Sequence, residues 1–155
     1  MISATSLLLL ATNSMSDKYF LDTNILVYAH DRLAGAKHQR ALTLIEQLWS
    51  TRMGVLSTQV LQEFCATVRK KLAEPLSLDD TQHVVRQYLA WEVVVNRPTD
   101  VLDAIQIEAR YRVSFWDALI LNSAERGGAT TLYTEDLSNG QRYGSVRVVN
   151  PFTSS

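Results

Sequence analysis

The chain has 155 residues with 15 basic and 16 acidic side chains, so its formal net charge at pH 7 is −1. This length is typical of one domain that needs neither disulfides nor a structural metal to hold its core. The balanced charge excludes binding to nucleic acid through net charge alone, so such a partner would need a local basic patch. The single cysteine, Cys65, stands at helical spacing from apolar residues, which favours a small core residue and a reducing cytoplasm as the setting.

Residues 1–15 are expected to form a loosely ordered N-terminal extension, followed by one domain over residues 16–155. The extension has a single short apolar run and no Lys or Arg. Neither a transmembrane helix nor a secretory signal is therefore predicted, and no membrane partner is expected. The sequence leaves open whether translation starts at Met1 or at Met15.

Short strands and longer helices alternate along the chain. In chain order, the predicted elements are a strand over residues 19–21, helices over 25–29 and 36–49, a strand over 53–56, helices over 58–72 and 77–89, a strand over 91–95, helices over 98–109 and 115–126, and strands over 130–133 and 146–149. A polar loop over residues 135–144 separates the last two strands. The helix over residues 98–109 is predicted to pack through Val101, Ile105 and Ala109.

Several of the helix starts carry capping residues, namely Ser57 and Thr58, the Ser77-x-x-Asp80 box, and Pro98. The alternation shows no internal repeat or linker and indicates a parallel sheet with helices on both faces. We therefore predict an α/β fold, a three-layer α/β/α sandwich around a mainly parallel five-stranded sheet. In such a sheet the carboxyl ends of the strands meet at one edge, where ligands bind.

Asp22 follows the first predicted strand directly, with Thr23 and Asn24 next in the chain. Its carboxylate is expected to point into the crevice at the strand ends, while Thr23 or Asn24 caps the helix that follows. The alternative is that Asp22 is itself the helix cap. Asp22 is the first candidate for chemistry.

Asp117 lies on a helix that is apolar almost all round, with Ile120, Leu121 and Ala124 as its neighbours one and two turns further on. An unpaired carboxylate on such a face would cost several kcal/mol, so Asp117 must have a partner. A Ser114-x-x-Asp117 capping box would supply one. The two roles are compatible, because a side chain in the first turn can also face the strand ends.

Two further acids fall near the same edge. Glu63 lies at the margin of an apolar helix stripe, where a solvated glutamate is the alternative interpretation. Glu135 and Asp136 follow the strand over residues 130–133, as Asp22 follows its own strand. One of these two loop acids is expected to face the crevice.

Four carboxylates at one edge would repel one another strongly unless a cation neutralised them. Oxygen ligands of this kind suit Mg²⁺ or Mn²⁺. Zinc is not expected, because His30, His38 and His83 lack ligand spacing and Cys65 has no second cysteine. The sequence also lacks a Gly-rich phosphate loop, a GxSxG elbow and a Ser/His/Asp arrangement.

The four acids stand in the segments DTNILVYA around Asp22, QVLQEF around Glu63, SFWDALIL around Asp117 and LYTEDL around Asp136. Together, in this order and spacing, these segments resemble the motifs of PIN domains, and in particular of the ribonuclease toxins of bacterial VapBC toxin–antitoxin pairs. The resemblance covers residues 18–149. It implies a PIN-like nuclease domain whose acidic pocket binds Mg²⁺ or Mn²⁺.

The resemblance also implies roles for individual residues. Metal ligands are expected at Asp22 and Asp117. Glu63 and Asp136 are expected to complete the acidic pocket, so that all four acids take part in catalysis and Glu135 does not. The supporting polar residues implied by the motifs are Thr23, Asn24 and Thr134.

The implied function is that of a toxin that hydrolyses single-stranded or structured RNA, tRNA included, through a metal-activated water. The implied partners are the RNA substrate and a cognate antitoxin that covers the pocket, and apolar helices beside the sheet would suit a homodimer. Because an acidic pocket repels RNA, basic residues outside it must steer the substrate. The candidates for this role are Arg69, Lys70, Lys71, Arg110, Arg112 and Arg142.

Two alternatives remain at this stage. A non-catalytic PIN-fold module that binds RNA or an antitoxin is disfavoured, because a degenerate version would be expected to lose some of the acids. A phosphatase with Asp22 as nucleophile is disfavoured too, because its usual second acid would stand where this chain has Asn24.

Overall fold

The structure, a computed structural model, describes residues 17–153 of the chain. The extension expected over residues 1–15, with the choice between Met1 and Met15 as the start, lies outside the described residues. Within the described part, none of the helices has both the length and the apolar character that crossing a membrane requires.

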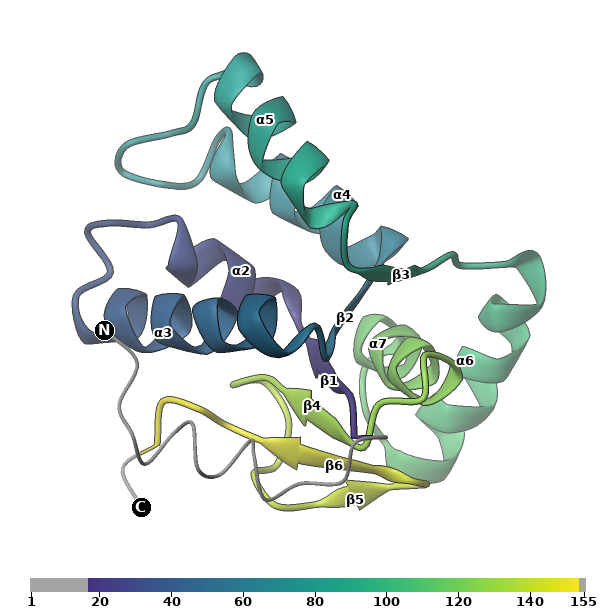
Figure 1. Cartoon of the computed structure of the whole chain (residues 1–155). Coiled ribbons are helices and arrows are strands. Elements are labelled where there is room, and N and C mark those ends of the chain that lie inside the picture. Colours follow the sequence, from purple (N-terminus) through teal and green to yellow (C-terminus); the bar gives the residue numbers. More distant parts are fainter. Residues whose placement is uncertain (1–16, 154–155) are drawn as a thin grey trace.

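The strands form a single six-stranded sheet in the order β3-β2-β1-β4-β6-β5 (Figure 1). The strands are β1 (Tyr19–Leu21), β2 (Gly54–Ser57), β3 (Glu92–Val94), β4 (Thr131–Tyr133), β5 (Arg142–Tyr143) and β6 (Val146–Val149). Neighbouring strands pair in parallel except for β5, which is antiparallel to β6. The mainly parallel sheet that the alternation of elements predicted is confirmed.

The sheet has one strand more than the five predicted, because β5 lies in the segment expected to be a polar loop. Tyr143 of β5 is buried and pairs with Val146 of β6. The turn between them is tight and uses Gly144, whose φ of +61° is accessible to glycine at little cost. A strand of two residues is too short to leave a periodic pattern in the sequence.

The described helices are α2 (Thr23–Ala29), α3 (Ala36–Thr51), α4 (Thr58–Val68), α5 (Leu78–Tyr88), α6 (Pro98–Tyr111) and α7 (Phe115–Arg126). Helices α2 and α3 connect β1 to β2, and α4 and α5 connect β2 to β3. Helices α6 and α7 then return the chain to β4, on the other side of β1. Right-handed crossovers place these two groups of helices on opposite faces of the sheet. Figure 1 shows the pair α2 and α3 on one side of β1 and the pair α6 and α7 on the other. The predicted three-layer α/β/α sandwich is therefore confirmed.

One helix is shorter than predicted, because α4 ends at Val68 and not at Leu72. The amide of Lys70 donates to the carbonyl of Thr67 at 3.2 Å, a tighter turn than an α-helix makes. The amide of Leu76 then donates to the Val68 carbonyl at 2.9 Å. This bond satisfies a carbonyl at the helix end, and the chain turns back toward α5.

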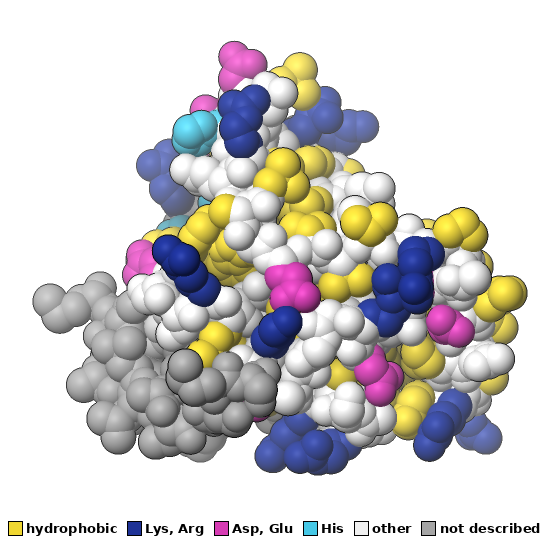
Figure 2. Space-filling model, turned by 45° about the vertical axis from the view of Figure 1, so that its right-hand side comes forward, with side chains coloured by type: hydrophobic (Ala, Val, Ile, Leu, Met, Phe, Trp, Pro, Cys, Tyr) yellow, Lys and Arg dark blue, Asp and Glu magenta, His cyan; other side chains and the backbone are white. Residues whose placement is uncertain are grey.

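The packing face of α6 differs from the predicted one. Ala104 is fully buried and clusters with Ala118 of α7, whereas Val101 and Ile105 are 44% and 50% exposed and Ala109 is also exposed. Small residues let α6 and α7 approach closely, with Ile107 of α6 packed beside them, while Val101 and Ile105 stay outside the contact. Figure 2, in which this side of the molecule comes forward, shows hydrophobic side chains on the surface between basic ones.

The hydrophobic core lies against the central strands. Phe20 of β1 and Leu132 of β4 are fully buried, as is Phe64 of α4. Burying one such side chain stabilises the fold by roughly 1.5–3 kcal/mol, so the core holds these strands firmly in place. Cys65, expected in the core, is only half-buried at the edge of α4.

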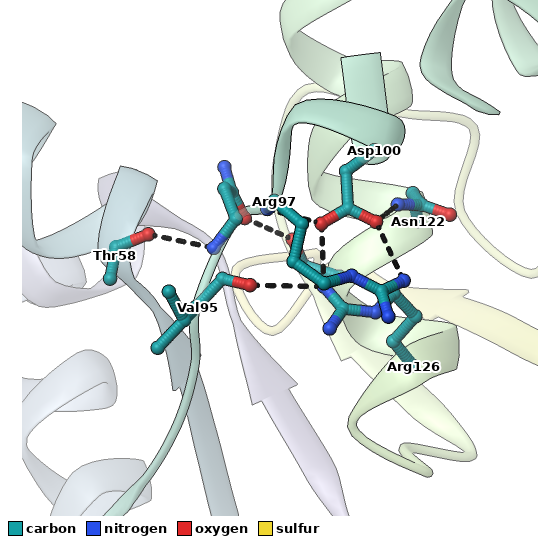
Figure 3. A network of polar contacts seen from close by, with 8 residues as sticks. Thr58, Val95, Arg97, Asp100, Asn122 and Arg126 are labelled. Atoms are coloured by element: carbon teal, nitrogen blue, oxygen red, sulfur yellow. Dashed lines mark hydrogen bonds and ion pairs between the residues drawn. The ribbon is translucent and has the colours of Figure 1, made fainter. Parts of the chain in front are cut away.

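A buried carboxylate fastens α6 and α7 together. Asp100 is 1% exposed, and its Oδ2 accepts from Arg126 Nη1 at 2.7 Å and from the Arg97 amide at 2.6 Å. Its Oδ1 accepts from Asn122 Nδ2 at 3.0 Å. The same Arg126 nitrogen also donates to the Val95 carbonyl at 3.1 Å, which ties α7 to the end of β3 (Figure 3). Burial works to raise the pKa of Asp100, but these hydrogen bonds and the Arg126 charge outweigh it and hold the pKa below its ordinary value.

We predict that Asp100→Ala lowers the free energy of unfolding by about 3 kcal/mol, because it leaves Arg126 and Asn122 without their shared partner. The matched control is Asp103→Ala, an exposed acid on the same helix, which should change stability by less than about 0.5 kcal/mol. Urea unfolding followed by circular dichroism measures both. Equal losses in the two variants would show that the Asp100 network is not a structural tie.

Candidate metal centre

Three carboxylates converge at the edge of the sheet where the parallel strands end. One oxygen each from Asp22, Asp117 and Asp136 lies within 4.8 Å of the others. Asp22 follows β1 and Asp136 follows its parallel neighbour β4, while Asp117 belongs to the first turn of α7. Glu63 of α4 lines the same cavity, whose volume is about 430 Å³. The structure thus brings the four predicted acids to one cavity.

Asp22 combines the two roles that the sequence left as alternatives. Its Oδ1 accepts a hydrogen bond from the Thr23 amide at 2.7 Å, so Asp22 is the N-cap of α2. Its Oδ2 accepts from the Thr134 hydroxyl at 2.8 Å. The residue is only 4% exposed, and these two bonds fix its carboxylate in one orientation at the cavity.

Asp136 is oriented by Asn24 and Thr134. Asn24 Nδ2 donates to Asp136 Oδ2 at 2.9 Å, and the Asp136 amide donates to Thr134 Oγ1 at 3.1 Å. Since the Thr134 hydroxyl also donates to Asp22, one buried side chain contacts both acids. Asn24 and Thr134, predicted as supporting residues, therefore lie in direct contact with the acids.

Glu135, the other acid of this loop, is occupied elsewhere. Its Oε1 accepts from the Tyr28 hydroxyl at 2.6 Å, and its Oε2 accepts from Lys37 Nζ at 2.7 Å. Burial works to raise the pKa of Glu135, but these bonds and the Lys37 charge outweigh it and place the pKa below its ordinary value. Of the two loop acids, Asp136 is the one that faces the other carboxylates.

Glu63 is held from two sides. The Thr23 hydroxyl donates to its Oε2 at 2.9 Å, and Gln59 Nε2 donates to its Oε1 at 2.7 Å. Gln59 also donates to the carbonyl of Trp116 at 3.3 Å, which links α4 to the first turn of α7. Sequence reasoning did not single out Gln59, although its spacing of four residues from Glu63 on a helix is a signal that could have found it.

Asp117 takes part in a helix cap and still faces the cavity. Its amide donates to Ser114 Oγ at 3.1 Å, so Ser114 is the N-cap of α7 as predicted. Its carboxylate is half-buried and points toward Asp22 and Asp136. The apolar helix α7 therefore directs Asp117, the acid in its first turn, to the ends of the strands.

The close approach of the acids changes their protonation. Burial raises the pKa of Asp22 to about 7; the hydrogen bonds from Thr134 and Thr23 oppose this rise, and the charges of Asp136 and Asp117 add to it. Burial also raises the pKa of Asp117, with the charges of Asp136 and Glu63 adding to the effect and Ser114 opposing it. Both carboxyls hold a proton more tightly than an ordinary aspartic acid does, because burial and the neighbouring acids both disfavour the ionised form. A bound cation would reverse this effect.

The donor set suits a small hard cation. Ligands of a six-coordinate Mg²⁺ lie up to about 4 Å apart, and the three carboxylate oxygens all lie within 4.8 Å of one another. Two amide oxygens that belong to residues lining the same cavity, Asn24 Oδ1 and Gln59 Oε1, are buried without a hydrogen-bond partner among the described residues. Buried polar atoms of this kind are normally satisfied by water or a ligand. Charge, atom type and spacing therefore all fit a hydrated divalent ion.

The architecture around these acids defines a family. The family model of the PIN domain matches residues 19–138, and the chain belongs to this family. The matched range contains the whole acidic cluster, Asp22, Glu63, Asp117 and Asp136. A search of curated protein sequences finds no match.

Solved structures with the same fold include toxin–antitoxin proteins. VapC20 from Mycobacterium tuberculosis, described as a toxin that cleaves the sarcin–ricin loop, is 17% identical with a TM-score of 0.59, and the match covers 77% of this chain and 92% of that chain. A toxin–antitoxin complex from Klebsiella pneumoniae is 18% identical with a TM-score of 0.63, covering 87% and 98%. FitAB bound to a DNA fragment is 19% identical with a TM-score of 0.63, covering 88% and 97%. At these identities the likeness shows the fold alone.

The raised pKa of Asp22 predicts how the stability of the metal-free protein depends on pH. Because the pKa is about 7 in the folded chain and 3.8 ordinarily, the folded state binds more protons between these values, and the free energy of unfolding falls as pH rises through this window. Asp22→Asn removes this titration. At pH 8 in chelator the variant should be about 2–4 kcal/mol more stable than the parent, and at pH 4 the two should be alike.

Thermal unfolding of the parent and Asp22→Asn across this pH range measures the effect. Adding Mg²⁺ at pH 8 should raise the Tm of the parent and leave that of Asp22→Asn nearly unchanged. Identical pH profiles for the two proteins would contradict the electrostatic account of the cavity.

Proposed function

We propose that this protein is the toxin of a toxin–antitoxin pair and acts as a Mg²⁺- or Mn²⁺-dependent endoribonuclease. The observation that carries this proposal is the convergence of Asp22, Asp117 and Asp136 on one cavity of a PIN domain, with Glu63 beside them. The raised pKa values of Asp22 and Asp117 support it, because buried and mutually repelling acids in a cavity are typical of a functional site.

In this proposal Asp22 and Asp117 hold the metal ion. A bound Mg²⁺ or Mn²⁺ supplies Lewis-acid chemistry: it lowers the pKa of a water and neutralises charge that develops on phosphate oxygens. Thr134 and Asn24 keep the carboxylates of Asp22 and Asp136 in place, so that the site does not need to rearrange when substrate arrives.

The reaction is hydrolysis of a phosphodiester bond. Water forms a new bond to phosphorus, the bond from phosphorus to the leaving sugar oxygen breaks, and that oxygen departs with a proton. Asp136 and Glu63 face the cavity and are the available acceptors for the proton that the attacking water loses. No side chain is needed as a nucleophile, which agrees with the absence of a Ser, Cys or His among the residues that line the cavity.

The proposed partners are an RNA substrate, single-stranded or structured and including tRNA, and a cognate antitoxin that covers the cavity. A structural neighbour that is a toxin–antitoxin complex, and one that is described as a sarcin–ricin loop cleaving toxin, support these partners. The basic residues considered for steering RNA are all exposed, namely Arg69, Lys70, Lys71, Arg110, Arg112 and Arg142. Action on RNA places the protein in the cytoplasm. A homodimer through the exposed apolar face of α6 belongs to the same proposal and is tested by sedimentation.

We predict that Asp22→Asn and Asp117→Asn each remain folded but lose Mg²⁺ binding and lower RNA cleavage by at least about 100-fold, because an amide keeps the shape of the carboxylate without its charge. The matched control is Glu135→Gln, which changes the acid next to Asp136 that pairs with Lys37 and should keep cleavage near the parent level. The measurement is cleavage of a panel of RNAs with Mg²⁺, with Mn²⁺ and with chelator.

The same panel separates the alternatives. Cleavage that survives in Asp22→Asn or Asp117→Asn would refute the assignment of the site. RNA or antitoxin binding without any metal-dependent cleavage would identify a binding module. Hydrolysis of small phosphate esters without cleavage of RNA would identify a phosphatase, although Asn24, which donates its amide to Asp136, stands where that chemistry needs an acid.

A further inference from the structure

The side chain next to Asp117 is a large aromatic ring that faces solvent. Trp116 is 62% exposed, and it lines the same cavity as the acids. Of the large hydrophobic side chains that are exposed in residues 17–153, Trp116 alone lines this cavity. An exposed apolar side chain needs no explanation by itself, but one that lines a cavity beside four acids will touch whatever binds there.

Trp116 has one contact through its ring and another through its backbone. The ring of Phe115 packs against it edge to face, with ring centroids 5.3 Å apart. Its backbone carbonyl accepts a hydrogen bond from Gln59 Nε2 at 3.3 Å, and Gln59 is itself 4% exposed and bonded to Glu63. The backbone of Trp116 is therefore anchored by the same buried amide that positions one of the acids. The side chain itself has only two torsion angles, so ordering it against a ligand costs little conformational freedom.

The acidic cavity by itself cannot attract RNA. The carboxylates of Asp22, Glu63, Asp117 and Asp136 repel a phosphate backbone, and the whole chain has a formal net charge of −1. Stacking of a base on an aromatic ring does not depend on charge and is available to every nucleobase. A phosphodiester that reaches the acids carries a base on each side, and Trp116 adjoins the acids. The chemistry that fits the ring is therefore the face of a nucleobase.

We propose that Trp116 is the stacking platform for one nucleobase beside the phosphodiester that is cleaved, with Phe115 bracing the ring and Gln59 acting as a positioning residue. This inference rests on the proposed nuclease function. It also defines the substrate more closely: in a duplex both faces of each base are covered by neighbouring bases, so a base can reach the ring only from an unpaired segment such as a loop, bulge or single strand. A segment of this kind is what the protein should cut.

The first test measures binding without cleavage. A short unstructured oligoribonucleotide is added in chelator, and tryptophan fluorescence and fluorescence anisotropy are followed. We expect quenching in the parent and in Trp49→Phe, which changes the tryptophan packed against Trp91, and no such quenching in Trp116→Leu. The affinity of Trp116→Leu should fall about 10-fold, whereas the slope of affinity against salt concentration should not change, because stacking releases no counterions.

The second test locates the base. After the cut site is mapped with Mg²⁺, each nucleotide around it is replaced in turn by an abasic one. At one position this replacement should lower kcat/KM of the parent about 10-fold but have little further effect in Trp116→Leu, which has already lost that contact. Trp116→Phe, which keeps an aromatic ring, should retain most of the activity. The control is Leu89→Ala: Leu89 is an exposed residue at the end of α5, before β3, and this variant should behave as the parent does.

The outcomes separate this inference from the nuclease function. Metal-dependent cleavage with equal abasic effects in the parent and Trp116→Leu, and with quenching retained in that variant, would overturn the stacking role, while the nuclease would stand. Absence of cleavage, with quenching that depends on Trp116 and not on Trp49, would overturn the nuclease and leave the base-binding site. Melting curves show whether Trp116→Leu is folded, as expected for an exposed side chain.

Discussion

The site depends on the parallel pairing of β1 with β4. Leu21 lies opposite Tyr133 in this pair, and the Asp22 amide extends the ladder by donating to the Tyr133 carbonyl at 3.0 Å. Asp22 and Thr134 consequently leave the sheet side by side, and the Thr134 hydroxyl reaches the carboxylate. A slip of one residue in this register would turn every side chain of β1 to the other face of the sheet and separate the two. The buried residues of β1 and β4 therefore determine the geometry of the acids as well as the stability of the fold.

Two buried aspartates of this chain show what their surroundings do to a carboxylate. Asp100 has Arg126, Asn122 and the Arg97 amide around it, and its pKa lies below the ordinary value. Asp22 also has hydrogen bonds, but its charged neighbours are acids, and burial together with these acids raises its pKa to about 7. The charge of Asp100 is balanced by groups of the same chain, and its contacts hold α6 and α7 together. The charge of Asp22 has no such balance, which costs stability and is typical of a site that a ligand completes.

The sequence was sufficient for whatever depends on local pattern. Strand ends and a helix start placed Asp22, Asp136 and Asp117 at one edge, and the alternation of elements predicted the layers of the fold. The main misses depend on contacts that leave no periodic pattern: the two-residue strand at Tyr143 is defined only by its pairing with Val146 across a tight turn, and the face that α6 buries is decided by α7. For the same reason Trp116 lay inside a recognised motif without being given a role. Whether an aromatic side chain is buried in the core or exposed at the edge of a cavity depends on which other segments cover it.

The acids in the cavity and the residues around it differ in charge and therefore suit different functions. In the proposed nuclease, the carboxylates repel RNA until a cation is bound, so they cannot supply the affinity that selects a substrate. Selection must then come from groups beside them, and on the described surface these are the exposed ring of Trp116 and the scattered basic side chains. Changes at such rim positions can alter which RNA is bound without disturbing Asp22, Thr134 or their hydrogen bond. A PIN domain built in this way can keep its chemistry constant while its choice of RNA changes.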